Sequence, residues 1–165
     1  MNLSFRIATT DDVPAVAMLR AAVAADLTRR HGHGHWSATA TEASVLRDVV
    51  SSRVLLARQG EQAIGTLRLA AKKPWAIDPA YFSPCKRALY LTDMAVLPEC
   101  QGRGIGRDCL EEARAIAAKW PADAIRLDAY DGPAGAGAFY AKCGFKEMGR
   151  VTYRKTPLVY YELMI

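Results

Sequence analysis

The middle of the chain reads Leu89-Tyr-Leu-Thr-Asp-Met-Ala-Val-Leu-Pro-Glu-Cys-Gln-Gly-Arg-Gly-Ile-Gly-Arg107. Its first half, from Leu89 to Leu97, is almost continuously apolar, which predicts a strand buried on both faces. Its second half has glycines at positions 102, 104 and 106, which allow the backbone to approach a ligand closely. The residues from Ile105 to Lys119 then predict a helix that ends before Pro121. A buried strand therefore passes through a glycine-rich turn into a helix.

The turn at residues 101–107 has the composition of an anion-binding loop. A helix that begins there presents unpaired N–H groups and the positive end of its dipole, and Arg103 and Arg107 add positive charge. The dinucleotide pattern GxGxxG fails, because its third glycine would fall on Arg107 or Cys109, and no Gly-Lys-Ser or Gly-Lys-Thr follows for a P-loop. The turn predicts a phosphate cradle of another type; a tight connection with solvated arginines is the alternative.

Strand and helix patterns flank this centre on both sides. Further strands are expected at 3–8, 53–58, 63–70, 125–130, 146–153 and 158–164, with the last turn around Thr156-Pro157. Further helices are expected from a Thr10-Asp11-Asp12 cap to about Arg30, at 41–51 and at 135–142. Residues 72–86 contain three prolines and predict a long loop. The fold class is mixed α/β or α+β, in one domain over 1–165.

Composition excludes several classes of protein. With 22 Lys and Arg against 17 Asp and Glu, the 165-residue chain carries a net charge of +5, and 51% of its residues are hydrophobic, as in a soluble globular protein. No apolar run reaches the ~20 residues of a membrane span. The sequence contains no long basic run of the kind that indicates nucleic-acid binding. Four scattered cysteines and the lack of a visible signal peptide predict a cytoplasmic protein.

Two segments together resemble motifs of the GNAT superfamily of acyl-CoA-dependent N-acetyltransferases. Met94 to Arg107 resembles motif A, in which a strand ending in Val-x-Pro-Glu precedes Gln/Arg-x-x-Gly-x-Gly/Ala. Phe139-Tyr-Ala-Lys-Cys-Gly-Phe145 resembles the Phe-Tyr-x-x-x-Gly-Phe of motif B. The resemblance is specific from about residue 89 to 146. It implies a splayed central sheet of six to seven strands flanked by about four helices.

The resemblance also implies acetyl-CoA as co-substrate and assigns residues to it. The main chain of three strand residues would pair with the pantetheine arm: Met94, Ala95 and Val96. The pyrophosphate would lie on the glycine-rich turn, formed by Gln101, Gly102, Arg103, Gly104, Ile105, Gly106 and Arg107. No metal is expected, since acyl transfer to an amine needs none.

Three residues are candidates for proton transfer. Tyr140 occupies the position of the motif-B tyrosine, which commonly protonates the leaving thiolate; the alternative is that it packs on the cofactor. Asp128 and Asp93 fall where relatives carry acidic residues, so either is a candidate general base. Either carboxylate could instead cap a backbone group or pair with an arginine, and a site without a dedicated base remains open.

The segment His31-Gly-His-Gly-His-Trp36 has three open interpretations. It could be a polar surface loop, or three imidazoles could bind a transition metal. The resemblance suggests a third possibility, because the connection between the first two helices often lines the acceptor pocket. On that interpretation His35 and Trp36 contact the substrate.

The sequence therefore predicts transfer of an acetyl group from acetyl-CoA to a primary amine of a small molecule, by direct attack in a ternary complex. The alternatives are acetylation of protein N-termini or lysines, and an acyl-CoA-binding module without catalysis. Nucleic acid and membranes are not expected as partners. The resemblance is compatible with a homodimer.

Overall fold

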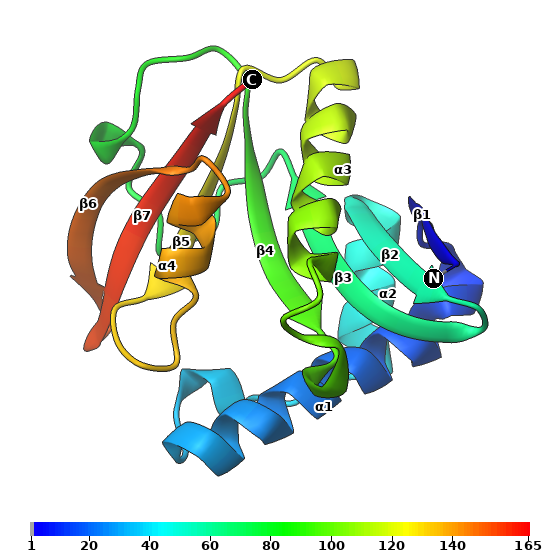
Figure 1. Ribbon diagram of the computed structural model, residues 1–165. Coiled ribbons are helices and arrows are strands. Elements are labelled where there is room, and N and C mark those ends of the chain that lie inside the picture. Colours follow the sequence, from blue (N-terminus) through cyan, green and yellow to red (C-terminus); the bar gives the residue numbers. More distant parts are fainter. Residues whose placement is uncertain (1) are drawn as a thin grey trace. The chain divides into compact units, whose positions relative to one another are not determined.

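The computed structural model describes residues 2–165, which form a seven-stranded sheet and four α-helices (Figure 1). The strands are β1 (Leu3–Ile7), β2 (Arg53–Gln59), β3 (Gln62–Ala70), β4 (Ala88–Val96), β5 (Ala124–Tyr130), β6 (Lys146–Tyr153) and β7 (Thr156–Met164). The helices are α1 (Val13–His31), α2 (Glu42–Ser51), α3 (Ile105–Lys119) and α4 (Gly137–Lys142). The predicted mixed α/β class is confirmed. None of these helices is both long and apolar enough to cross a bilayer.

The strands follow the order β1-β2-β3-β4-β5-β7-β6. β4 and β5 are parallel, and their register joins Ala88–Tyr90 to Ala124–Arg126. The pairs β1–β2, β2–β3, β5–β7 and β6–β7 are antiparallel. A parallel pair needs a long crossover, and α3 provides it between β4 and β5.

The chain divides into two compact units. The first contains the chain up to Ala70 together with Thr92–Ala113, and the second contains Ala71–Leu91 together with Arg114–Ile165. The boundary falls inside β4, between Leu91 and Thr92. A single domain over 1–165 stays a prediction.

In the first unit, α1 and α2 contact β2 and β3 through small and branched apolar side chains (Figure 1). Val16, Val45 and Leu56 are fully buried in this core. Thr10–Asp12 forms a 3-10 turn before α1, and Asp12 is the N-cap residue of α1 as predicted, although its side chain makes no capping hydrogen bond to that helix. The Asp12 carboxylate instead accepts hydrogen bonds from Arg6 (2.6 Å) and Arg58 (3.2 Å), which holds its pKa well below its usual range. Asp12 thus fastens two strands to the start of α1.

In the second unit, the proline-rich segment after β3 is fixed against the sheet. The Tyr160 hydroxyl on β7 accepts from the Asp78 N–H (3.1 Å) and donates to the Ala76 carbonyl. Phe82 packs on the Tyr160 ring with the centroids 5.1 Å apart. The predicted long loop is confirmed, and these contacts show why it is ordered.

The turn between β6 and β7 differs from the prediction. Thr156 pairs with Tyr153, and Pro157 pairs with Thr152, so both belong to the strand. The turn consists of Arg154 and Lys155, whose φ angles are +46° and +68°. The predicted turn at Thr156-Pro157 is therefore wrong by two residues.

Candidate active site

The turn between β4 and α3 uses two glycines in a conformation that other residues adopt poorly. Gly102 and Gly104 have φ angles of +77° and +85°, in the left-handed region. A Cβ atom added to either would meet no other atom within 4 Å. A side chain at either position would therefore strain the backbone, while the space beside each glycine is open to a ligand.

The first turn of α3 provides hydrogen-bond donors beside this open space. The Asp108 N–H donates to the Gly104 carbonyl (3.0 Å), which is the first hydrogen bond of the helix. The N–H groups of Ile105, Gly106 and Arg107 precede it and have no helical carbonyl to bond. Ile105 is buried and anchors this end of the helix, whereas Arg107 is exposed. Donors, helix dipole and arginine together suit an anion.

Short hydrogen bonds hold the turn to the strands of the first unit. Leu97 N–H donates to the Ile64 carbonyl (2.8 Å), and Cys100 N–H donates to the Leu97 carbonyl (2.8 Å). The Gln101 side chain donates through Nε2 to the Val96 carbonyl (3.0 Å). These bonds fix the backbone before the glycines, so a ligand meets a preformed surface.

The strand before the turn contains an irregularity that sequence reasoning missed. Asp93 has a φ of +53° in the middle of β4, and its side chain is exposed. Such a conformation costs a non-glycine residue about 1–2 kcal/mol and interrupts the alternation of the strand. Next to it, the hydroxyl of Thr92 is buried without a hydrogen-bond partner. After the irregularity Ala95 is buried, and Met94 and Val96 are half-buried.

Tyr140 lies in α4 inside an aromatic cluster of the second unit. Its side chain is buried, and the Phe139, Phe145 and Tyr161 rings lie with their centroids 5.4, 5.7 and 6.2 Å from its own. Burial raises the pKa of Tyr140, and the charges of Asp128 and Cys143 raise it further. The phenol therefore stays protonated throughout the neutral range.

Asp128 on β5 lies in the electrostatic environment of Tyr140. It stands opposite Tyr160 in the β5–β7 register, and burial raises the pKa of its carboxyl. A carboxylate in such surroundings accepts a proton more readily than one in water. The second unit thus brings two of the three proton-transfer candidates together, while Asp93 and the glycine-rich turn belong to the first.

Gly135 and Gly137, just before and at the start of α4, have no room for a side chain, which the sequence alone did not reveal. A Cβ at Gly135 would lie 1.8 Å from the Tyr130 carbonyl oxygen. A Cβ at Gly137 would lie 2.5 Å from the Tyr161 hydroxyl. The signal that could have revealed them is the close spacing of glycines before an aromatic helix.

The histidine segment is ordered around Trp36. The indole Nε1 donates to the Gly32 carbonyl (2.9 Å), and a Cβ at Gly34 would lie 2.5 Å from the indole ring. His35 is exposed, while His31 ends α1 with its Nε2 buried and without a hydrogen-bond partner. Within residues 2–165, no three His, Cys, Asp or Glu side chains form a group that could hold a metal ion. A contact between His35 or Trp36 and the acceptor stays a prediction.

Comparison with solved structures shows which proteins share this fold. The PaiA N-acetyltransferase of Thermoplasma acidophilum, in complex with coenzyme A, superposes with a TM-score of 0.75 at 18% identity, covering 99% of this chain and 100% of that one. A ribosomal-protein-alanine N-acetyltransferase of Brucella melitensis gives 0.73 at 19% identity, covering 98% and 99%. The putative acetyltransferase yncA of Salmonella typhimurium, with its cofactor acetyl-CoA, gives 0.70 at 17% identity, covering 98% and 93%. These likenesses establish the fold.

At the level of sequence, no curated protein gives a significant match. A family model does match: the acetyltransferase (GNAT) domain aligns with residues 50–147, more than half of the chain. The matched region includes β4, the glycine-rich turn and Tyr140. The chain therefore belongs to the GNAT family of acetyltransferases, which transfer an acetyl group from acetyl-CoA.

Proposed function

We propose that this acetyltransferase modifies a primary amine of a small molecule by direct attack on the thioester in a ternary complex. The observation that carries its cofactor part is the β4–α3 turn, where N–H groups without a helical partner and two exposed arginines adjoin glycines with open space beside them. Coenzyme A carries a pyrophosphate, and a helix N-terminus of this kind is suited to one. Gln101–Arg107 are the residues we assign to it.

The strand residues Met94, Ala95 and Val96 are proposed to contact the pantetheine arm through their main chain. An amide-rich arm can pair with strand backbone as an added strand does. The Val96 carbonyl already accepts from Gln101. A further contact at Val96 therefore uses the second lone pair of that oxygen or the N–H group.

Asp128 is our first candidate for the group that receives the amine proton. An alkylamine of pKa about 10.4 is neutral in only roughly one molecule of 2,500 at pH 7, so a proton acceptor helps. Burial raises the pKa of Asp128, which makes it a stronger acceptor. The exposed Asp93 is the second candidate; its left-handed backbone directs its side chain out of the regular strand pattern.

Tyr140 is proposed to donate its phenolic proton, or a hydrogen bond, to the departing thiolate. A thiol has a pKa of about 8.5 and a phenol about 10, and burial raises that of Tyr140 further, so full transfer is uphill. The phenol therefore contributes most while the carbon–sulfur bond is breaking, when charge on sulfur is developing. The proton that Tyr140 loses must be restored from solvent or from the amine.

The amine acceptor is the least constrained part of the proposal. His35 and Trp36 remain our candidates for contacts with it. The related fold of a ribosomal-protein-alanine N-acetyltransferase makes a protein N-terminus the alternative acceptor. A cytoplasmic location and a homodimer also stay predictions.

Calorimetric titration with acetyl-CoA tests the proposal. The decisive variant is Gly104→Ala, and its matched control is Gly60→Ala in the β2–β3 turn, where φ is +60° and no atom lies within 4 Å of an added Cβ. Both variants should lose a similar stability, about 1–2 kcal/mol. Only Gly104→Ala should weaken acetyl-CoA binding, because its methyl group enters the cradle. If both variants bind acetyl-CoA equally well, the cofactor does not bind at the turn.

Turnover then separates the acceptor classes. Thiol release is measured with a panel of free amines and with peptides bearing free N-termini or lysines. Activity on free amines supports the proposal, whereas activity confined to peptides supports the protein acceptor. Binding of acetyl-CoA without turnover on either panel would indicate an acyl-CoA-binding module.

A further inference from the structure

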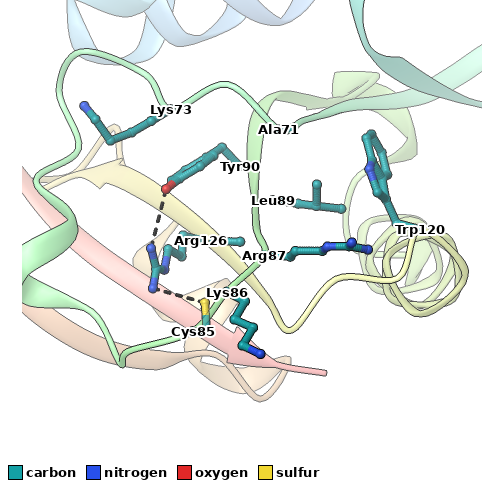
Figure 2. Close-up of a pocket in the computed structure, with 10 residues that line it drawn as sticks. Ala71, Lys73, Cys85, Lys86, Arg87, Leu89, Tyr90, Trp120 and Arg126 are labelled. Carbon is teal, nitrogen blue, oxygen red and sulfur yellow. Dashed lines mark hydrogen bonds between the residues drawn. The ribbon is translucent and has the colours of Figure 1, made fainter.

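A cavity of about 610 Å³ opens in the second unit, where the chain enters β4 (Figure 2). None of the residues proposed above for acetyl transfer lines it. Four of its ten lining residues are basic: Lys73, Lys86, Arg87 and Arg126. No Asp or Glu is among its lining residues. The cavity therefore has the charge of an anion site and a volume within the usual range of ligand pockets, about 300–1,000 Å³.

The carboxylates next to the cavity leave most of this charge uncompensated. Glu162 accepts from Arg126 Nε at 3.0 Å, so it neutralises the buried guanidinium. Asp123 accepts from the backbone N–H groups of Lys86 (3.1 Å) and Arg87 (2.8 Å), not from their side chains. Within residues 2–165, no ion pair engages the side chains of Lys73, Lys86 or Arg87. Three positive charges thus remain at the cavity.

Several of these groups are held in place before a ligand arrives. Lys73 Nζ donates to the carbonyls of Pro74 (2.9 Å) and Ile77 (2.8 Å), which orients the ammonium without neutralising it. An ammonium has three donors, so one remains. Arg126 is 6% exposed, and it is fixed by Glu162 and by the Ser83 carbonyl at 2.7 Å. Such preorganisation lowers the entropy cost of binding.

An apolar wall adjoins the charged groups. Leu89, Tyr90 and Trp120 all line the cavity. Figure 2 shows Arg87 extending toward Trp120 at the end of α3, and the guanidinium of Arg126 between the Tyr90 hydroxyl and the Cys85 thiol. A ligand in this position meets cations and an aromatic surface together.

We propose that this cavity is a second ligand site, which binds a small organic polyanion: a molecule with phosphate or carboxylate groups carrying at least two negative charges, and with a planar apolar part. The anionic groups lie against Lys86 and Arg87, and the planar part lies against Trp120, toward which Arg87 extends. This site is separate from the glycine-rich turn that we assign to coenzyme A.

Calorimetric titrations with phenyl phosphate, inorganic phosphate and citrate test the proposal. The variant Lys86→Ala with Arg87→Ala removes two adjacent cations from the cavity. The variant Arg154→Ala with Lys155→Ala removes the same charge from the β6–β7 turn of the same unit and is the matched control. The cavity variant should bind phenyl phosphate or citrate at least about tenfold more weakly, and the control should bind them like the wild type.

The probes also separate the chemistry of the ligand. Tighter binding of phenyl phosphate than of inorganic phosphate supports the planar part of the proposal, and equal binding overturns that part. Tighter binding of citrate than of phenyl phosphate would also contradict the planar part, because citrate has no planar apolar group. Failure of all three probes to bind at millimolar concentration overturns the site, as does an equal loss of affinity in both variants.

Cys85 offers an independent readout, because it lines the cavity and is half-buried. A bound probe should slow its alkylation by neutral iodoacetamide and leave that of Cys143, which is half-buried elsewhere, unchanged. Acetyl-CoA affinity should be the same in the wild type and the cavity variant. A parallel loss of acetyl-CoA binding would show that coenzyme A itself occupies the cavity and would overturn a separate site.

Discussion

The side-chain amide of Gln101 donates a hydrogen bond to the main-chain carbonyl of Val96, with 3.0 Å between Nε2 and the oxygen. The bond joins the first residue of the proposed cradle to the last residue of β4. It therefore couples the end of the strand that we assign to pantetheine with the turn that we assign to the pyrophosphate.

Gln101→Ala should weaken acetyl-CoA binding. The hydrogen bond contributes about 0.5–1.5 kcal/mol, so a loss of affinity of about two- to tenfold is expected. Gln62→Ala, at an exposed position at the start of β3, is the control and should bind normally. Titration calorimetry provides the measurement, and unchanged affinity in Gln101→Ala would show that the bond does not order the cradle.

Tyr140→Phe should lower kcat about 10²-fold while leaving acetyl-CoA affinity nearly unchanged, because only the proton donor is removed. Tyr161→Phe removes a hydroxyl from the same aromatic cluster and should have little effect on kcat. Since burial raises the pKa of Tyr140, its ionisation should cause no decline in rate between pH 7 and pH 9. Equal rates in the two variants would remove Tyr140 from the mechanism.

Asp128→Asn should change the pH dependence of the rate. Because burial raises the pKa of Asp128, the wild-type value of kcat/KM should decrease as pH falls through that raised pKa, where the proton acceptor becomes occupied. The asparagine variant should be slower and should lack this acidic decline. An acidic decline that persists in Asp128→Asn belongs to another group, and Asp93→Asn is then the next variant.

Asp128→Asn should also change how the stability of the protein depends on pH. A carboxyl whose pKa is higher in the folded state than the unfolded value of about 3.9 stabilises the fold when protonated, and this contribution is lost as pH rises. The stability of Asp128→Asn relative to wild type should therefore increase from pH 4 to pH 7 in urea titrations. The exposed Asp11→Asn variant controls for the change in net charge. A flat difference would contradict the burial effect.

Gly135→Ala should destabilise the protein and disturb α4. The added methyl group would lie 1.8 Å from the Tyr130 carbonyl oxygen, so the backbone must shift, at a cost of about 1–3 kcal/mol. Gly132→Ala, three residues earlier, places its methyl group in open space and should be nearly neutral. Thermal melting compares the two, and turnover shows whether displacement of α4 reaches Tyr140.

The β6–β7 turn should accept a stabilising sequence. Arg154 and Lys155 both have positive φ, which asparagine and glycine adopt more readily. Arg154→Asn with Lys155→Gly should raise the free energy of unfolding by about 1 kcal/mol. Arg154→Ala with Lys155→Ala keeps the strain and should show no gain. Urea unfolding measures the free energy of unfolding of both variants. An unchanged value in Arg154→Asn with Lys155→Gly would contradict a turn at these two residues.

Local sequence determined the elements that carry the proposed chemistry. The apolar run before Leu97 and the glycines after it predicted β4, the turn and α3, and α3 was predicted at its observed bounds. These signals depend on neighbouring residues alone: strand burial leaves an apolar run, a left-handed turn favours glycine, and a helix ends near proline. The two motifs also identified the family.

Contacts between distant residues were decided by the tertiary structure. The β6–β7 turn lies at Arg154-Lys155 because Thr156 and Pro157 pair with Tyr153 and Thr152 of β6, and the Pro157 carbonyl also accepts from the Asp131 N–H (2.9 Å). Asp12 is the N-cap residue of α1, but its carboxylate binds Arg6 and Arg58, since packing brings β1 and β2 beside it. Asp93 departs from a strand pattern that gave no sign of it.

The same division applies to the candidate sites. The proposed phosphate cradle could be predicted from the sequence alone, because its donors are consecutive residues of one turn. Only the folded second unit places Asp128 near Tyr140 and gathers Lys73, Lys86, Arg87 and Arg126 around one cavity. Burial and electrostatic proximity depend on the packing of segments far apart in the chain, and no local pattern of residues encodes that packing.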